Sequence, residues 1–103
     1  MKIEGIKEKV SQGRYIISFT HTEKLRQRRM KAEDIERAIQ TGAIIEDYPE
    51  DRRGPSCLIL GFVGKRLLHV VCGRLDAEEI LIITAYEPDP TEWDSDGKTR
   101  KRR

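Results

Sequence analysis

The sequence has little cysteine and no long apolar run. Its two cysteines, Cys57 and Cys72, are too few for the disulfide framework that stabilises many small secreted domains. No apolar stretch approaches the roughly 20 residues that a membrane-spanning helix requires. The N-terminal residues MKIEGIKEKV carry acids and lysines where a signal peptide would be apolar. We therefore expect a cytoplasmic protein that has free thiols and no membrane partner.

Aromatic residues are also scarce, at 6% of the 103 residues, whereas charged and apolar residues each make up 37%. The apolar residues gather in periodic segments, which is typical of a folded chain. A chain of this length is too short to divide into two stable cores. After Tyr86 the composition changes to EPDPTEWDSDGKTRKRR, in which only Trp93 has enough apolar area to anchor the segment. We expect one domain over residues 1–90 and a flexible basic tail over residues 91–103.

The net charge of +2 is small, but the charges are unevenly distributed. Without the five basic residues among the last six, the chain keeps 15 basic and 18 acidic side chains. A second basic cluster consists of Lys24, Arg26, Arg28, Arg29 and Lys31. Such clusters bind phosphate backbones, although a solvated helix face followed by a disordered tail has the same composition. The charge pattern therefore keeps nucleic acid among the candidate partners.

Hydrophobic periodicity predicts the order helix, strand, two helices and four strands. We expect helices over residues 1–12, 23–29 and 32–41, and strands over residues 15–20, 43–48, 57–63, 67–72 and 80–86. This order is typical of an α+β fold, in which a mostly antiparallel sheet of four to five strands is packed by two or three helices.

A glycine-lysine pair at residues 64–65 separates two strands rich in aliphatic residues, which predicts a tight hairpin. In this hairpin His69 faces Leu60, and Cys57 faces Cys72. The polar connection that follows is too long to fix the register of the last strand. The hairpin therefore places one histidine in the middle of the sheet, whereas the last strand keeps an open register.

Because Cys57 and Cys72 face each other, a disulfide or a metal site at this position has to be considered. The sequence favours neither. With a two-residue turn, Cys57 and Cys72 form the wider, hydrogen-bonded kind of cross-strand pair, in which a disulfide would be strained. Their spacing is not that of a zinc knuckle, and His69 points to the opposite face of the sheet. We expect two buried thiols, no metal and no cofactor.

Several strings of the sequence carry a resemblance to a known family. They are His21 ahead of the basic helix with Arg29, then IIEDYPED, PSCLILG, LLHVV and IITAYEPD, followed by Trp93 and Arg100. In this order they resemble the bacterial family known as domain of unknown function 4258, over about residues 15–100. The resemblance implies a compact fold related to the RelE/ParE toxin superfamily, and a small zinc-finger protein of the antitoxin type as partner. It implies no settled activity, so function has to come from the site.

RelE-like toxins that are catalytic cut RNA without a metal. This reaction needs a base near the ribose 2′-hydroxyl, an acid near the leaving oxygen and positive charge on the phosphate. Histidine and tyrosine can handle the protons, and arginine can hold the phosphate. The candidate catalytic residues are His21, Arg29, His69 and Tyr86, and the candidate nucleic-acid-binding residues are Lys24, Arg26, Arg28 and Arg100.

Each candidate catalytic residue also has a structural interpretation. His69 falls on a sheet face made of leucine, phenylalanine and valine, where a histidine is more often a neutral, hydrogen-bonded core residue. His21 and Arg29 could instead cap a helix and pair with an acidic neighbour at residues 46–47. Tyr86 is structural unless it shares the face of His69, which the open register leaves undecided.

Two functional hypotheses follow from the sequence. The first is a toxin-like component of a bacterial toxin–antitoxin pair that acts on RNA or the ribosome; if it is an enzyme, it is a metal-independent endoribonuclease. The second is a non-catalytic module that binds a protein or nucleic acid through an open sheet edge or the basic helix. A buried His69 that is distant from every arginine would favour the second hypothesis.

Overall fold

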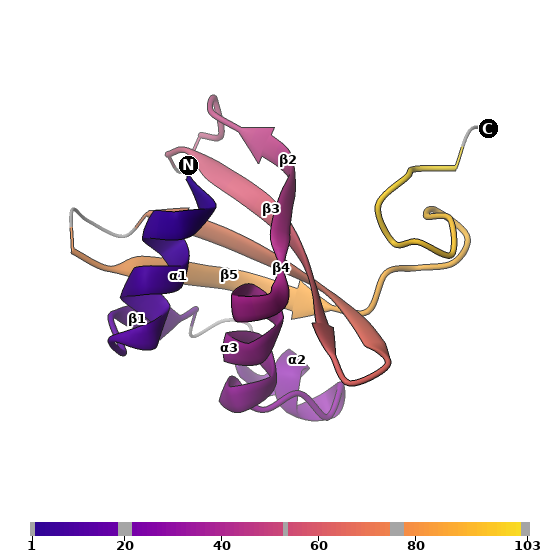
Figure 1. Cartoon of the computed structure of the whole chain (residues 1–103), viewed down its shortest axis with the longest axis horizontal. Helices are drawn as coiled ribbons and strands as arrows, with labels where there is room; N and C mark the ends of the chain where they lie inside the picture. The colour runs from indigo at the N-terminus through magenta and orange to yellow at the C-terminus, as the bar shows by residue number, and fades with distance from the viewer. Residues whose placement is uncertain (1, 19–21, 53, 75–77, 102–103) are drawn as a thin grey trace.

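The computed structural model describes residues 2–18, 22–52, 54–74 and 78–101. Within these ranges the chain folds into three helices and five strands in the predicted order, so the predicted α+β class is confirmed (Figure 1). No helix of the described chain has the length and apolarity needed to cross a bilayer. The elements are α1 (Ile3–Ser11), β1 (Tyr15–Ile17), α2 (Thr22–Gln27), α3 (Ala32–Thr41), β2 (Ala43–Tyr48), β3 (Ser56–Val63), β4 (Arg66–Arg74) and β5 (Ile80–Tyr86).

The strands form one mixed sheet with the order β1-β5-β4-β3-β2. β1 runs parallel to β5, whereas the other neighbouring strands are antiparallel. The predicted first strand over residues 15–20 is shorter in the structure and ends at Ile17. Residues 19–21, which include the candidate His21, lie outside the described residues.

The hairpin of β3 and β4 has the predicted register. It turns at residues 64–65, where a φ of 60° at the first position suits glycine. His69 pairs with Leu60, and Cys57 pairs with Cys72. Both cysteines are free and buried, as the sequence favours.

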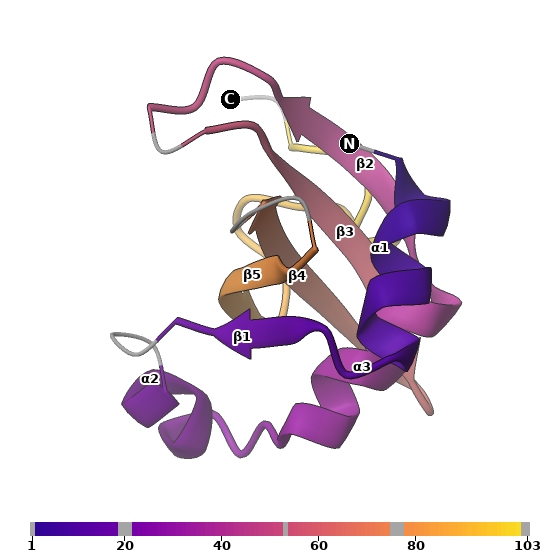
Figure 2. The same cartoon turned by 90° about the vertical axis from the view of Figure 1, so that its left-hand side faces the viewer.

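Two helices cover one face of the sheet (Figure 2). Helix α1 buries Ile6 and Val10, which lie four residues apart on one side of the helix. Helix α3 buries Ile35, Ala38 and Ile39, which share one stripe for the same reason. These stripes meet the inward-facing aliphatic side chains of β3, β4 and β5, and together they form the main core.

Helix α3 lies so close to β3 that residue 61 has to be glycine. A Cβ atom placed on Gly61 would lie 1.8 Å from the carbonyl oxygen of Ala38. A glycine within a strand often marks such a close approach of another backbone. This contact fixes α3 over the middle of the sheet.

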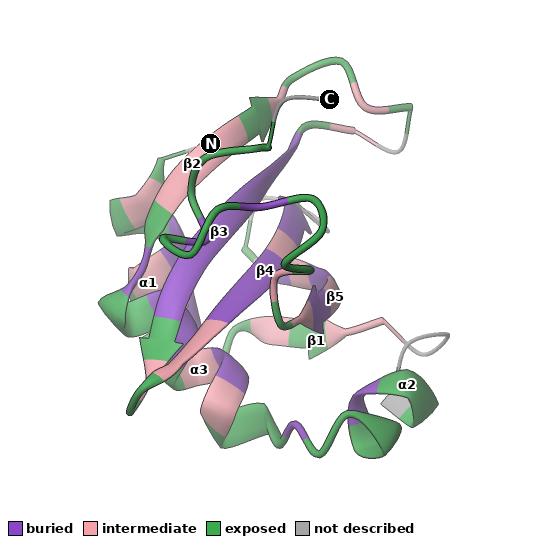
Figure 3. Cartoon of the chain, turned by 90° about the vertical axis from the view of Figure 1, so that its right-hand side faces the viewer, coloured by how far each residue is buried: buried purple, intermediate pink, exposed green. Residues whose placement is uncertain are grey.

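The chain after β5 covers the other face of the sheet (Figures 1 and 3). Trp93 is only 4% exposed, and it forms an antiparallel bridge with Arg100. Gly97 is also buried, and its carbonyl oxygen accepts a hydrogen bond of 2.7 Å from Nε2 of His69. Residues 93–100, which lie in the stretch expected to be a tail, therefore pack on the domain.

Candidate functional site

His69 and Tyr86 are neighbours on the face of the sheet that the C-terminal segment covers. They are directly paired between β4 and β5. Their ring centroids lie 5.5 Å apart, with the ring planes at 73°. The register that the sequence left open therefore places Tyr86 on the same face as His69.

His69 is sealed from solvent. Its exposed fraction is 0%, and the ring of Trp93 lies edge-on with its centroid 4.6 Å away. Because Gly97 offers a carbonyl oxygen, Nε2 carries the proton, while Nδ1 has no hydrogen-bond partner within the described residues. Burial lowers the pKa of His69, so the ring is neutral near pH 7. His69 therefore lies in the environment of a neutral, hydrogen-bonded core residue.

Arg100 packs against Trp93, the residue that covers His69. Its guanidinium lies over the ring of Trp93, 4.5 Å from the centroid. Its Nε and Nη2 atoms donate to the two carboxylate oxygens of Glu46 at 2.8 and 2.9 Å, and the hydroxyl of Tyr48 donates to the same carboxylate. The hydrogen bond from Arg100 lowers the pKa of Glu46. Arg100, a candidate for binding nucleic acid, thus binds a carboxylate of its own chain.

The basic helix α2 is attached to the body by apolar side chains. Leu25 and Met30 are 4% and 6% exposed, whereas the cations of this stretch are exposed. Arg28 directly follows α2, and its amide donates to the carbonyl of Lys24, so these two cations lie on one side of Leu25 and Arg26 lies on the other. The cations of α2 therefore form two separate flanks.

Arg28, which directly follows the last residue of α2, reaches the end of β5. Its Nη1 atom donates to the carbonyl oxygen of Ala85 at 2.7 Å. A surface hollow of about 340 Å³ lies there, lined by Arg28, Met30, Tyr86 and Glu87. Burial raises the pKa of Tyr86, so its phenol stays protonated. Guanidinium, phenol and carboxylate groups therefore share one solvent-reachable hollow.

Two residues of this hollow were missed by the sequence analysis. Glu87 follows Tyr86 directly and forms an ion pair with Arg66, whose Nε donates to it at 2.8 Å. Met30 follows the basic helix and is 6% exposed. The sequence gave little reason to single them out, because a glutamate after a strand and a methionine after a helix are ordinary residue types at those positions.

Arg29 does not line this hollow. It is exposed and lies in the turn after α2 with a φ of 56°, a left-handed conformation that favours glycine. The backbone bonds from Arg29 to Arg26 and from Met30 to Leu25 complete the helix end. Of the four candidate catalytic residues, the structure brings together His69 and Tyr86, places Arg29 elsewhere, and leaves His21 outside the described residues.

The described residues contain no group of three or more histidine, cysteine, aspartate or glutamate side chains that could hold a metal. The side chains of the hollow offer anion binding by Arg28, hydrogen bonding and stacking by Tyr86, and a carboxylate at Glu87.

Comparison with curated proteins and comparison with solved structures gave no match. A family model, described as domain of unknown function (DUF4258), matches residues 21–87. The matched range includes α2 and the strands β2 to β5, ends at Glu87 of the hollow, and covers well over half of the chain. The chain therefore belongs to the DUF4258 family.

Proposed function

We propose that this chain binds RNA as a toxin-like component of a bacterial toxin–antitoxin pair, and that it acts by holding RNA or the ribosome rather than by cutting RNA with His69. The observation that carries the proposal is the hollow where Arg28 and Tyr86 meet beside exposed cations. The proposal includes the likeness to RelE/ParE toxins that was inferred from the sequence. The growth of cells that express the chain tests this toxin-like role.

Arg28 is suited to bind a phosphate. A guanidinium has five N–H donors in a rigid fork, and the bond from Arg28 to the carbonyl of Ala85 uses one of its nitrogens. The remaining donors are available to a phosphate in the bidentate geometry that arginine favours. Because the carbonyl already orients the side chain, less conformational entropy is lost on binding.

The rest of the hollow suits a nucleotide better than an isolated anion. The ring of Tyr86 offers an aromatic face or edge to a base, and its protonated phenol can donate a hydrogen bond. Lys24 and Arg29 are exposed near the same end of α2 and add sequence-independent attraction to a phosphate backbone. A ribose-phosphate chain with unstacked bases combines both kinds of group.

Binding without cleavage agrees with the state of His69. A general acid or base has to come within about 3 Å of the proton that it transfers. The imidazole of His69 lies beneath Trp93 and Gly97 and is held neutral by burial. A reacting ribose therefore has no path to this ring while the C-terminal segment is in place.

The test is a titration of a fluorescein-labelled single-stranded RNA, followed by anisotropy over a range of salt concentrations. Arg28→Gln is expected to weaken binding about tenfold and to reduce the slope of log K against log salt by about 0.7. Arg28→Lys keeps the charge but not the fork, so its salt slope should stay while affinity falls.

Arg52→Gln is the matched control, because Arg52 is an exposed arginine of the loop between β2 and β3. It lines neither of the two hollows that lie next to α2. Equal affinities of Arg28→Gln and Arg52→Gln would contradict the site. Expression of the chain alone should slow growth, and Arg28→Gln should relieve this effect. Cleavage of the labelled RNA by purified protein would overturn the proposed mode of action.

A further inference from the structure

The outer edge of β1 is an unpaired strand edge within the described sheet. The carbonyl of Arg14 accepts from the amide of Ile80, and the amide of Ser18 donates to the carbonyl of Ile82. Backbone groups of alternate residues in a strand point to opposite sides. The amide and carbonyl groups of Tyr15 and Ile17 therefore point away from β5.

The other edge of the sheet, β2, is protected in ways that β1 is not. It carries Glu46 and Asp47, and its register shifts between Ile44 and Glu46. Charged side chains and bulges are the usual devices that keep an edge strand from pairing with another chain. β1 has neither device, and Ile16 is a large apolar residue that is 45% exposed on it.

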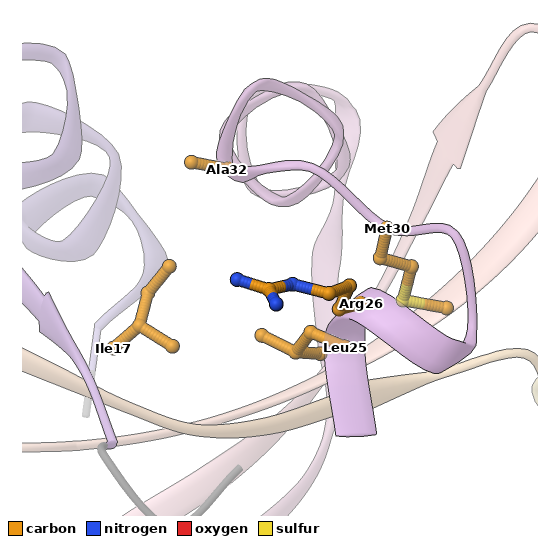
Figure 4. A pocket seen from close by; sticks show the side chains of 5 residues that line it. All are labelled: Ile17, Leu25, Arg26, Met30 and Ala32. Atoms are coloured by element: carbon orange, nitrogen blue, oxygen red, sulfur yellow. The ribbon is translucent and has the colours of Figure 1, made fainter. Parts of the chain in front are cut away.

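A groove of about 290 Å³ lies between β1, α2 and the start of α3 (Figure 4). Figure 4 shows the guanidinium of Arg26 reaching across the groove toward Ile17. Arg26 forms an ion pair with Glu23 at 3.9 Å, which is too long for a hydrogen bond. The groove is lined by Ile17, Leu25, Arg26, Met30 and Ala32.

We propose that the β1 edge and this groove together dock an extended, acidic segment of a partner protein, which adds to the sheet as a strand beside β1. One aliphatic side chain of the segment enters the groove between Ile17 and Ala32, and a carboxylate of the segment pairs with Arg26. In this mode of recognition, main-chain hydrogen bonds supply affinity and pockets for alternate side chains supply specificity.

The lining of the groove distinguishes this occupant from others. Apart from Arg26, the described residues that line it are apolar, and none of these described residues offers an aromatic platform for a nucleic-acid base. Its volume lies just below the range of roughly 300–1,000 Å³ for small-molecule sites, and its described lining residues include a single charged group. One aliphatic side chain of the partner fits the small volume of the groove, and a neighbouring carboxylate of the partner complements the charge of Arg26.

This inference goes beyond RNA binding, since it depends on Arg26 and β1 rather than on Arg28 and Tyr86. The probe is a short fluorescent peptide in which leucine alternates with glutamate, and its binding is followed by anisotropy. Saturable binding is expected. Arg26→Gln should weaken it about two- to fivefold, as the loss of an exposed ion pair does, and Ala32→Leu should also weaken it by narrowing the groove.

Two observations separate strand addition from loose charge attraction. On peptide binding, amide hydrogen exchange at Tyr15 and Ile17 should slow, because these groups gain partners. A peptide with lysine in place of glutamate, and one with serine in place of leucine, should both fail to bind. Arg52→Gln should bind the acidic peptide like the unaltered chain.

Several results would overturn the inference: no saturable binding, equal binding of the lysine peptide, or unchanged exchange at Tyr15 and Ile17. Protection of the same amides by RNA alone would make RNA the occupant. Protection that rises with protein concentration alone, together with dimers in sedimentation, would make it a second copy of this chain. A chain that binds the acidic peptide but not RNA would contradict only the proposed function.

Discussion

The imidazole of His69 lies edge-on to the indole of Trp93, with their ring centroids 4.6 Å apart and their planes at 81°. This contact joins the centre of β4 to a segment that follows the last strand. The sheet is therefore covered by helices on one face and by a polypeptide segment on the other. Such double coverage accounts for the buried run from Ser56 to Gly61 in β3, which shows no alternation of exposed and buried residues.

Removal of the indole should weaken the cover strongly. Trp93→Ala is expected to lower the free energy of unfolding by about 3 kcal/mol, since a buried aromatic side chain and its packing are lost. Trp93→Phe should cost less, because it keeps a ring against His69. Urea unfolding followed by circular dichroism is the measurement, since Trp93 is the one tryptophan of the sequence. A loss below about 1 kcal/mol would mean that the segment is held by other contacts.

The buried imidazole should make stability fall in weak acid. Burial lowers the pKa of His69 from 6.5, an effect opposed by its hydrogen bond to Gly97 and by Glu46. The unfolded chain therefore takes up this proton first, so the stability gained from a neutral His69 is complete above pH 6.5 and declines as the pH falls below it.

His69→Gln isolates this contribution, because it removes the titrating group while His21 remains in both proteins. Urea midpoints measured from about pH 7.5 to pH 5 should decline less steeply in the variant than in the unaltered chain. The absolute stability of the variant is not the readout, since the amide replaces the bond to Gly97 imperfectly. Parallel profiles would show that another group causes the decline.

Local sequence was sufficient to predict the order of helices and strands and the register of the hairpin of β3 and β4. Residues 64–65 form a tight turn, so the pairing of His69 with Leu60 follows from counting outward along two strands. The boundaries of α3 were also predicted correctly, because Gly42 follows its last residue. The parallel pairing of β1 with β5 had no such signal, since it joins distant segments and depends on packing.

The composition of the hollow depends on a detail that sequence does not carry. The register of β4 and β5 shifts between Val71 and Cys72, so that Tyr86 pairs with His69. Without this shift Ala85 would pair with His69, and Tyr86 would point to the helix face. The predicted pair of His69 and Tyr86 thus shares a face only because of one irregularity in the ladder.

The turn after α2 should be stabilised by glycine. Arg29 has a φ of 56°, and a side chain in this conformation costs about 1 kcal/mol relative to glycine. Arg29→Gly is therefore expected to raise the free energy of unfolding by roughly 0.5–1 kcal/mol. Arg29→Ala removes the same charge but keeps the Cβ atom, so it should give no gain. Equal urea midpoints for the two variants would assign the effect to the charge.

Two glycines with opposite surroundings should respond in opposite ways to alanine. Gly5 lies inside α1, and a Cβ atom there would meet nothing within 4 Å. Gly5→Ala should therefore stabilise the fold by about 0.5–1 kcal/mol through helix propensity. At Gly61 the same atom would lie 1.8 Å from the carbonyl of Ala38, so Gly61→Ala has to push α3 away from β3.

The contact at Gly61 involves backbone on both sides, so no side chain can move to relieve it. Gly61→Ala should consequently lose several kcal/mol of stability or fail to fold, as expected when a strained backbone contact adds to core disruption. Thermal unfolding of both variants by circular dichroism is the measurement. A Gly61→Ala protein with an unchanged midpoint would show that α3 does not pack on β3 at this distance.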